Sequence, residues 1–125
     1  MEHPNATLFR RITEAMSNGD WETINNALAD DVEWHEIGRT EPIRGRAAMM
    51  NREPGGPETD YSIEYDVHDV VANDEHTIGL GEATATRNGR TLKYRTAEIL
   101  HVKDGKVTGR WAFSDDTQRI IDFFK

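Results

Sequence analysis

The chain has 125 residues and no cysteine, so a single domain over residues 1–125 is expected, without a disulfide framework or a thiolate metal site. The formal net charge of -8 argues against a nucleic-acid partner, because phosphate backbones are bound by basic surfaces. The sequence contains no apolar run near the roughly 18 residues of a membrane span, and its start contains no signal-peptide hydrophobic segment. A cytoplasmic protein without a membrane partner is therefore expected.

The first part of the chain is predicted to form two amphipathic helices. Apolar residues at helical spacing predict a helix from Asn5 to Ser17, with Asn5 or Thr7 as its N-cap. Asp20 is a suitable N-cap for a second helix, from Trp21 to Ala29.

A short strand and a third helix are predicted next. Val32 to Glu36 alternates, which places Trp34 on one face and His35 on the other. After a turn-rich loop, Gly45 to Arg52 is predicted to be helical, and the run Glu53 to Pro57 ends that helix.

Two further strands are predicted from Tyr61 to Ala72 and from Thr77 to Thr86, joined by turn residues. Gly79 and Gly81 lie inside the second of these strands. They lack the third glycine and the following helix of a phosphate-binding loop, so sheet curvature is the better interpretation.

The segment from Arg90 to Asp115 is predicted to be the central β-hairpin, with its turn at Lys103-Asp104-Gly105. A two-residue turn places Glu98 opposite Trp111. A three-residue loop with Gly105 in the left-handed region places Glu98 opposite Arg110 instead. The second register is favoured because it pairs an acid with a base.

A last helix is predicted after Asp115 or Asp116, either of which can cap it. The order of elements predicts an α+β domain in which helices cover one face of a curved sheet and enclose a pocket. The other face would expose apolar side chains, so a homodimer through that face is expected. The side chains expected there are Arg95, Ala97, Ile99, Trp111 and Phe113.

Several segments resemble a known family. They are Ala29-Asp30-Asp31-Val32, the run Glu33 to Gly38, Glu41-Pro42, Arg44-Gly45, the Asp104 to Val107 turn, and Trp111 to Asp115. In order and spacing, nearly the whole chain resembles the nuclear transport factor 2-like superfamily, in its ketosteroid isomerase and SnoaL-like polyketide cyclase branch. The resemblance implies a cone-shaped α+β barrel, with a curved mixed or antiparallel sheet around a pocket.

The resemblance also implies roles for polar residues. His35 falls where the isomerases have a proton-transferring aspartate, and the resemblance places it at the floor of the cone; a neutral imidazole can serve as a base there. Glu98 falls where they have an acid that donates a hydrogen bond to an oxyanion, with Arg110 as its electrophilic partner. Each has a structural alternative, since His35 can pack beside Trp34, and Glu98 with Arg110 can form a buried ion pair.

Asp115 falls about where SnoaL-like cyclases keep an acid/base aspartate, but it also stands where a helix needs its N-cap. The tyrosine of the isomerase oxyanion hole has no counterpart, because Ile12 occupies its place. The candidate ligand contacts are Tyr65, Tyr94, Thr96, Ala112, Ser114 and Ile12.

Two functional hypotheses follow. The first is a cofactor-free acid/base enzyme, of isomerase, cyclase or hydrolase type, that acts on a small, mostly apolar, oxygen-bearing molecule with His35 as its base. The second is a protein that binds or senses such a ligand without turnover. No metal is expected, because the remaining histidines form no spaced ligand set. Convergence of His35, Glu98 and Arg110 on one cavity would favour the enzyme.

Overall fold

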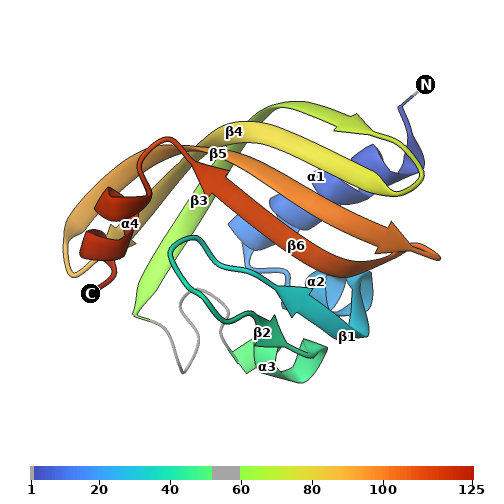
Figure 1. The fold of residues 1–125 in the computed structure, drawn as a ribbon, viewed down its shortest axis with the longest axis horizontal. Helices are drawn as coiled ribbons and strands as arrows, with labels where there is room; N and C mark the ends of the chain where they lie inside the picture. The colour runs from blue at the N-terminus through green and yellow to red at the C-terminus, as the bar shows by residue number, and fades with distance from the viewer. Residues whose placement is uncertain (1, 52–59) are drawn as a thin grey trace.

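The chain folds as helices packed on one curved sheet (Figure 1). The computed structural model describes residues 2–51 and 60–125. Within these ranges the helices are α1 (Pro4–Asn18), α2 (Trp21–Ala27), α3 (Arg46–Asn51) and α4 (Thr117–Phe123). The strands are β1 (Leu28–Trp34), β2 (Ile43–Arg44), β3 (Tyr61–Ala72), β4 (His76–Arg87), β5 (Arg90–Lys103) and β6 (Lys106–Ser114).

The sheet has the strand order β2-β1-β6-β5-β4-β3. The pairing of β1 with β6 is parallel and the other neighbours are antiparallel, so the sheet is mixed. Its long strands bend over α1 (Figure 1), so the sheet has a concave face toward the helices and an outer face away from them. The predicted α+β class, with a curved sheet and helices on one face, is confirmed.

Close packing of α1 on the concave face depends on a glycine. The buried face of α1 contains Phe9, whose ring lies over Gly79 of β4. A Cβ at Gly79 would come within 2.1 Å of the Phe9 ring. A Cβ at Gly81 would meet the backbone oxygen of Asp66 at 2.5 Å, next to the register shift after Val67. Both glycines thus lie in a strand and permit close approach where the sheet bends.

The end of the second helix was predicted two residues too late. α2 ends at Ala27, and Leu28 already belongs to β1. Leu28 is fully buried and pairs with Val107 across the parallel β1–β6 contact. This long-range pairing overrides the local helical pattern.

One of the three predicted caps is wrong, and the two alternatives predicted for the last helix are resolved. The side chain of Asp20 accepts a hydrogen bond from the Thr23 amide, as predicted. The N-cap of α1 is His3 rather than Asn5 or Thr7, because the His3 ring accepts from the Asn5 amide. α4 is capped by Asp116, whereas the Asp115 carboxylate accepts from the Arg95 amide.

Both predicted registers of the central hairpin are wrong. The turn has two residues, Asp104 and Gly105, each with positive φ, and Lys103 pairs with Lys106. A bulge then adds Thr108 to β6, and its hydroxyl donates to the backbone oxygen of His101 at 3.3 Å. The extra residue moves the register by one, so Glu98 lies opposite Ala112.

The predicted third helix is confirmed as α3 from Arg46 to Asn51. Its predicted last residue, Arg52, and the predicted stop from Glu53 to Pro57 lie outside the described residues. Among the described helices, none has the length and apolar character needed to cross a membrane.

Candidate ligand cavity

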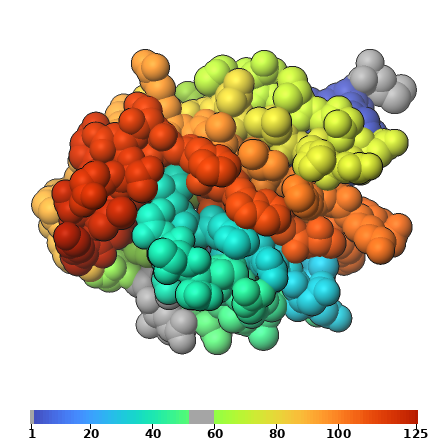
Figure 2. All heavy atoms as spheres, in the orientation of Figure 1, coloured from blue at the N-terminus to red at the C-terminus, as the bar shows by residue number. Residues whose placement is uncertain are grey.

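A cavity of about 390 Å³ lies on the concave side of the sheet. Its wall combines side chains from α1, α3 and α4 with the loop after β1 and with strands β1, β3, β5 and β6. The loop after β1 lies against α4 at the surface (Figure 2), where a Cβ on Gly38 would come within 2.6 Å of the Ile121 side chain. Gly38 and Ile121 both line the cavity at this place.

Arg110 lines the cavity from β6, with only 5% of its surface exposed. One terminal nitrogen donates to the backbone oxygen of His35 at 3.0 Å, and the other lies 3.4 Å from a carboxylate oxygen of Glu98. The guanidinium also lies over the Trp34 ring, 4.8 Å from its centroid. Burial alone would lower the pKa of Arg110, but the Glu98 charge raises it, so the guanidinium stays charged.

The predicted contact between Glu98 and Arg110 is confirmed, although the predicted register is wrong. Arg110 lies opposite Leu100, which is two residues from Glu98 on the same face of β5. The ion pair is therefore diagonal across the two strands, within reach of long side chains.

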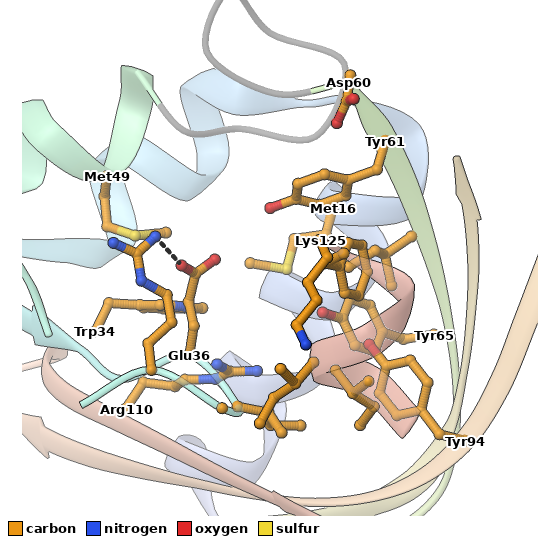
Figure 3. A pocket seen from close by; sticks show the side chains of 17 residues that line it. Met16, Trp34, Glu36, Met49, Asp60, Tyr61, Tyr65, Tyr94, Arg110 and Lys125 are labelled. Atoms are coloured by element: carbon orange, nitrogen blue, oxygen red, sulfur yellow. Dashed lines mark hydrogen bonds and ion pairs between the residues drawn. The ribbon is translucent and has the colours of Figure 1, made fainter. Parts of the chain in front are cut away.

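Tyr65 and Tyr94 line the opposite side of the cavity, and their hydroxyls point into it (Figure 3). Burial raises the pKa of Tyr94 to about 12, and it raises the pKa of Tyr65 well above its usual value, with a further contribution from Glu98. Both side chains are therefore protonated near neutral pH and can donate hydrogen bonds.

The rim of the cavity carries charged residues that form ion pairs. Arg39 lies 3.2 Å from Glu36 (Figure 3). Asp60 lies 3.0 Å from Arg87, and the ammonium of Lys125 lies 3.3 Å from Asp122. Each of these pairs, among the described residues, joins one positive and one negative side chain.

His35 does not lie at the cavity floor, where the resemblance placed it. Its ring stacks on Trp111 on the outer face, with centroids 4.8 Å apart and planes 15° apart. Trp111 in turn contacts His101, which contacts His76, so four rings form a row across the outer face. The alternation of Trp34 and His35 between the two faces of β1 was predicted correctly. Trp34 is the one that faces the cavity, so the side chain of His35 points outward.

The other candidate residues are spread over three environments. Ile12 is buried in the hydrophobic core with 4% of its surface exposed. Thr96, Ser114 and Asp115 border a shallow depression near the end of β6, and Ala112 lies opposite Glu98. Of the ten candidates, the described cavity wall contains Arg110, Tyr65 and Tyr94.

Several wall residues were not selected from the sequence. They include Met16, Trp34, Met49, Tyr61, Ile63 and Phe124. Tyr61 and Ile63 share the strand parity of Tyr65, so the same alternation could have found them. Met49 and Phe124 gave only a helical apolar pattern, which is equally typical of core residues.

Comparison with models of protein families shows the family to which the chain belongs. The model of the SnoaL-like domain matches residues 9–110, and the chain belongs to this family. This finding confirms the resemblance seen in the sequence. The comparison with curated proteins gave no match.

Solved structures show the same fold. Bal32a from a soil-derived mobile gene cassette is 24% identical with a TM-score of 0.84, and the match covers 98% of this chain and 97% of that chain. An epoxide hydrolase of the LEH-like type from Mycobacterium tuberculosis is 20% identical with a TM-score of 0.76, covering 90% and 83%. A proposed polyketide cyclase from Xanthomonas campestris is 22% identical with a TM-score of 0.79, covering 98% and 97%. At these identities the likeness shows the nuclear transport factor 2-like fold alone.

Proposed function

We propose that the protein binds a small, mostly apolar molecule in the cavity between the sheet and its helices. The volume of about 390 Å³ supports this, because small-molecule sites commonly span about 300 to 1,000 Å³. The wall is formed largely by apolar and aromatic side chains, and charged groups and tyrosine hydroxyls lie among them. That combination is typical of a pocket that holds an apolar body and orients one polar group.

The observation that carries this proposal is the buried charge at the cavity wall. Arg110 stays charged although it is almost fully buried, and it is held by Glu98, Trp34 and the backbone oxygen of His35. Burying an ion costs free energy unless it is paired, and apolar residues of similar volume often stabilise a fold as well. A role in ligand recognition explains why a guanidinium occupies this place.

The proposal can be tested with N-phenyl-1-naphthylamine, an uncharged probe that fluoresces strongly in apolar surroundings. The wild-type chain should bind it with saturation. Ile63→Trp fills the cavity and should weaken binding by about tenfold or more, because the probe loses its space. Thr86→Trp adds a similar side chain at an exposed position of β4 and should leave binding unchanged. Equal binding by both variants would contradict the proposal.

A second candidate function is acid/base turnover of the bound molecule. It is favoured by the Glu98 carboxylate, which interacts with Arg110 and contributes to the raised pKa of Tyr65. Glu98 is not among the described wall residues, so in this candidate its carboxylate positions Arg110, and the guanidinium stabilises the developing oxyanion. With 2-decalone in D₂O, Glu98→Gln should then slow exchange of the protons next to the carbonyl by at least about tenfold. An exchange rate equal to the buffer rate in the wild type would exclude this activity for that ketone.

The proposal includes a homodimer. The outer face of the sheet is not covered by the described helices, and Phe113 exposes 59% of its surface there. Ala97, Ile99 and Trp111 lie beside it on the same face. An apolar surface of this kind is better shielded by a second copy of the chain than left to water.

A further inference from the structure

Two histidines meet on the outer face of the sheet, away from the cavity. His76 begins β4 and His101 lies near the end of β5, and the antiparallel register places them directly opposite each other. Side chains of directly opposite residues project from the same face of a sheet. Their ring centroids are 4.7 Å apart, with 78° between the ring planes. Because strand pairing brings them together from distant parts of the sequence, the spacing of histidines along the chain could not indicate this pair.

The two imidazoles have ring contacts but no polar partner within the described residues. His76 contacts His101, and His101 also contacts Trp111. Neither imidazole forms a hydrogen bond or an ion pair with a described residue. His3 and His35, by contrast, each lie beside a carboxylate. His76 is exposed and His101 is half-buried, so the pair is open to ions in solution.

The separation of the two rings matches that of two imidazoles on one metal ion. An ion about 2.0–2.1 Å from one nitrogen of each ring, with a bond angle of about 90° to 110°, places the ring centroids roughly 4.5–5.2 Å apart. The separation between His76 and His101 lies within this range. The terminal torsion of a histidine side chain is broad, so rotation about it can turn one nitrogen of each ring toward a shared ion. Chelation therefore needs no change in the strand register.

We propose that His76 and His101 chelate a divalent transition-metal ion, and that Cu²⁺ binds more tightly there than Ni²⁺ or Zn²⁺. Imidazole nitrogens suit all three ions, and Cu²⁺ has the highest intrinsic affinity of the series. Among the described residues no cluster of three or more side chains is suited to hold a metal, so two imidazoles are the protein ligands and water fills the other positions. The net charge of -8 favours the approach of a cation. This site does not depend on a ligand in the cavity.

Calorimetric titration of the full chain with CuSO₄ tests the site. A histidine near the start of a chain can bind Cu²⁺ together with backbone nitrogens, so the titrations use His3→Asn, in which asparagine keeps an N-cap acceptor. This variant should bind one Cu²⁺ per chain. Adding His76→Ala or His101→Ala should weaken binding by at least about tenfold, because the two ligands no longer act together. Adding His68→Ala, at an exposed position of β3, should leave the affinity unchanged.

Trp111 reports where the ion binds. Its ring centroid lies 4.6 Å from that of His101, so bound Cu²⁺ should quench its fluorescence with the same saturation as the heat signal. Trp111→Phe should keep the Cu²⁺ affinity within about threefold and lose most of the quenching.

Unchanged Cu²⁺ affinity in both His76→Ala and His101→Ala, or saturating binding without quenching of Trp111, would overturn the site. If a variant does not fold, nuclear magnetic resonance of the histidine rings during titration of the wild type with Zn²⁺ decides. Joint shifts of the His76 and His101 ring signals support the pair, and shifts confined to other histidines contradict it.

Discussion

The side chain of Arg110 combines three fixed contacts with the proposed role in ligand recognition. Its guanidinium contacts the Trp34 ring, the Glu98 carboxylate and the backbone oxygen of His35, and these contacts fix its position. Because the guanidinium is held on three sides, its orientation beside the cavity is fixed before any ligand binds. Preorganised donors of this kind bind an acceptor without a cost of ordering at the moment of binding.

The position of His35 leads to a first prediction. Because its ring stacks on Trp111 on the outer face, His35→Ala should leave the affinity for N-phenyl-1-naphthylamine within about twofold. The same change should alter the fluorescence of Trp111, which loses its stacking partner. His68→Ala, at an exposed position of β3, serves as the control for both readouts. A tenfold loss of affinity in His35→Ala would show that the imidazole reaches the ligand and would restore it as a candidate base.

The buried tyrosines predict a loss of stability at high pH. Burial raises the pKa of Tyr94 from 10.0 to about 12, so the unfolded chain releases this proton at a lower pH than the folded chain. The contribution of this group to the free energy of unfolding is fully present below pH 10. It is lost as the pH rises toward 12, by at most roughly 1.4 kcal/mol per pH unit. Urea unfolding between pH 8 and about 11.5 measures this slope. Tyr94→Phe should make the decline shallower, and an equally steep decline in that variant would contradict the assignment.

At the scale of single elements, the central hairpin shows the limit of sequence reasoning. The charged pair was predicted from the pattern of the strands, and it forms as an ion pair. Its register could not be predicted, because the bulge at Thr108 depends on a hydrogen bond to His101 that leaves no mark in the alternation of side chains. The same holds for Leu28, whose place in β1 depends on pairing with Val107.

The turn of this hairpin leads to a prediction about stability that does not depend on the register of the two strands. Gly105 has a φ of 76°, and apart from its chain neighbours no atom of the described residues lies within 4 Å of a Cβ placed there, so backbone strain is what opposes a side chain. Gly105→Ala should therefore destabilise the chain by about 1 kcal/mol. Gly105→Asn should cost less, because asparagine tolerates the left-handed region better. Thermal unfolding compares the two, and an equal cost would show that strain is not the cause.

At the scale of the whole molecule, the fold was easier to predict than the site. The order of helices and strands and the family segments define the α+β class, and each depends on many residues. The site depends on which face of one short strand points inward. Trp34 faces the cavity and its neighbour His35 faces outward, and strand parity alone cannot choose between these two arrangements.

The exposed outer face predicts self-association. Phe113 exposes 59% of its surface and Leu80 exposes 38%, so Phe113→Glu should disrupt a dimer formed through this face. Light scattering at micromolar concentration should give a dimer mass for the wild type and a monomer mass for Phe113→Glu. Thr86→Glu, exposed on the same sheet, should remain a dimer. A monomer mass for the wild type would remove the proposed dimer.

The most direct test of ligand binding in the cavity is an isotope-filtered nuclear Overhauser spectrum of the chain with 2-decalone. Contacts from the ligand protons to the rings of Tyr65 and Tyr94 and to the Ile63 methyl groups are predicted, because these side chains line the cavity. Contacts to Trp111 and Phe113 without any contact to the tyrosines would place the ligand on the outer face and contradict a cavity site.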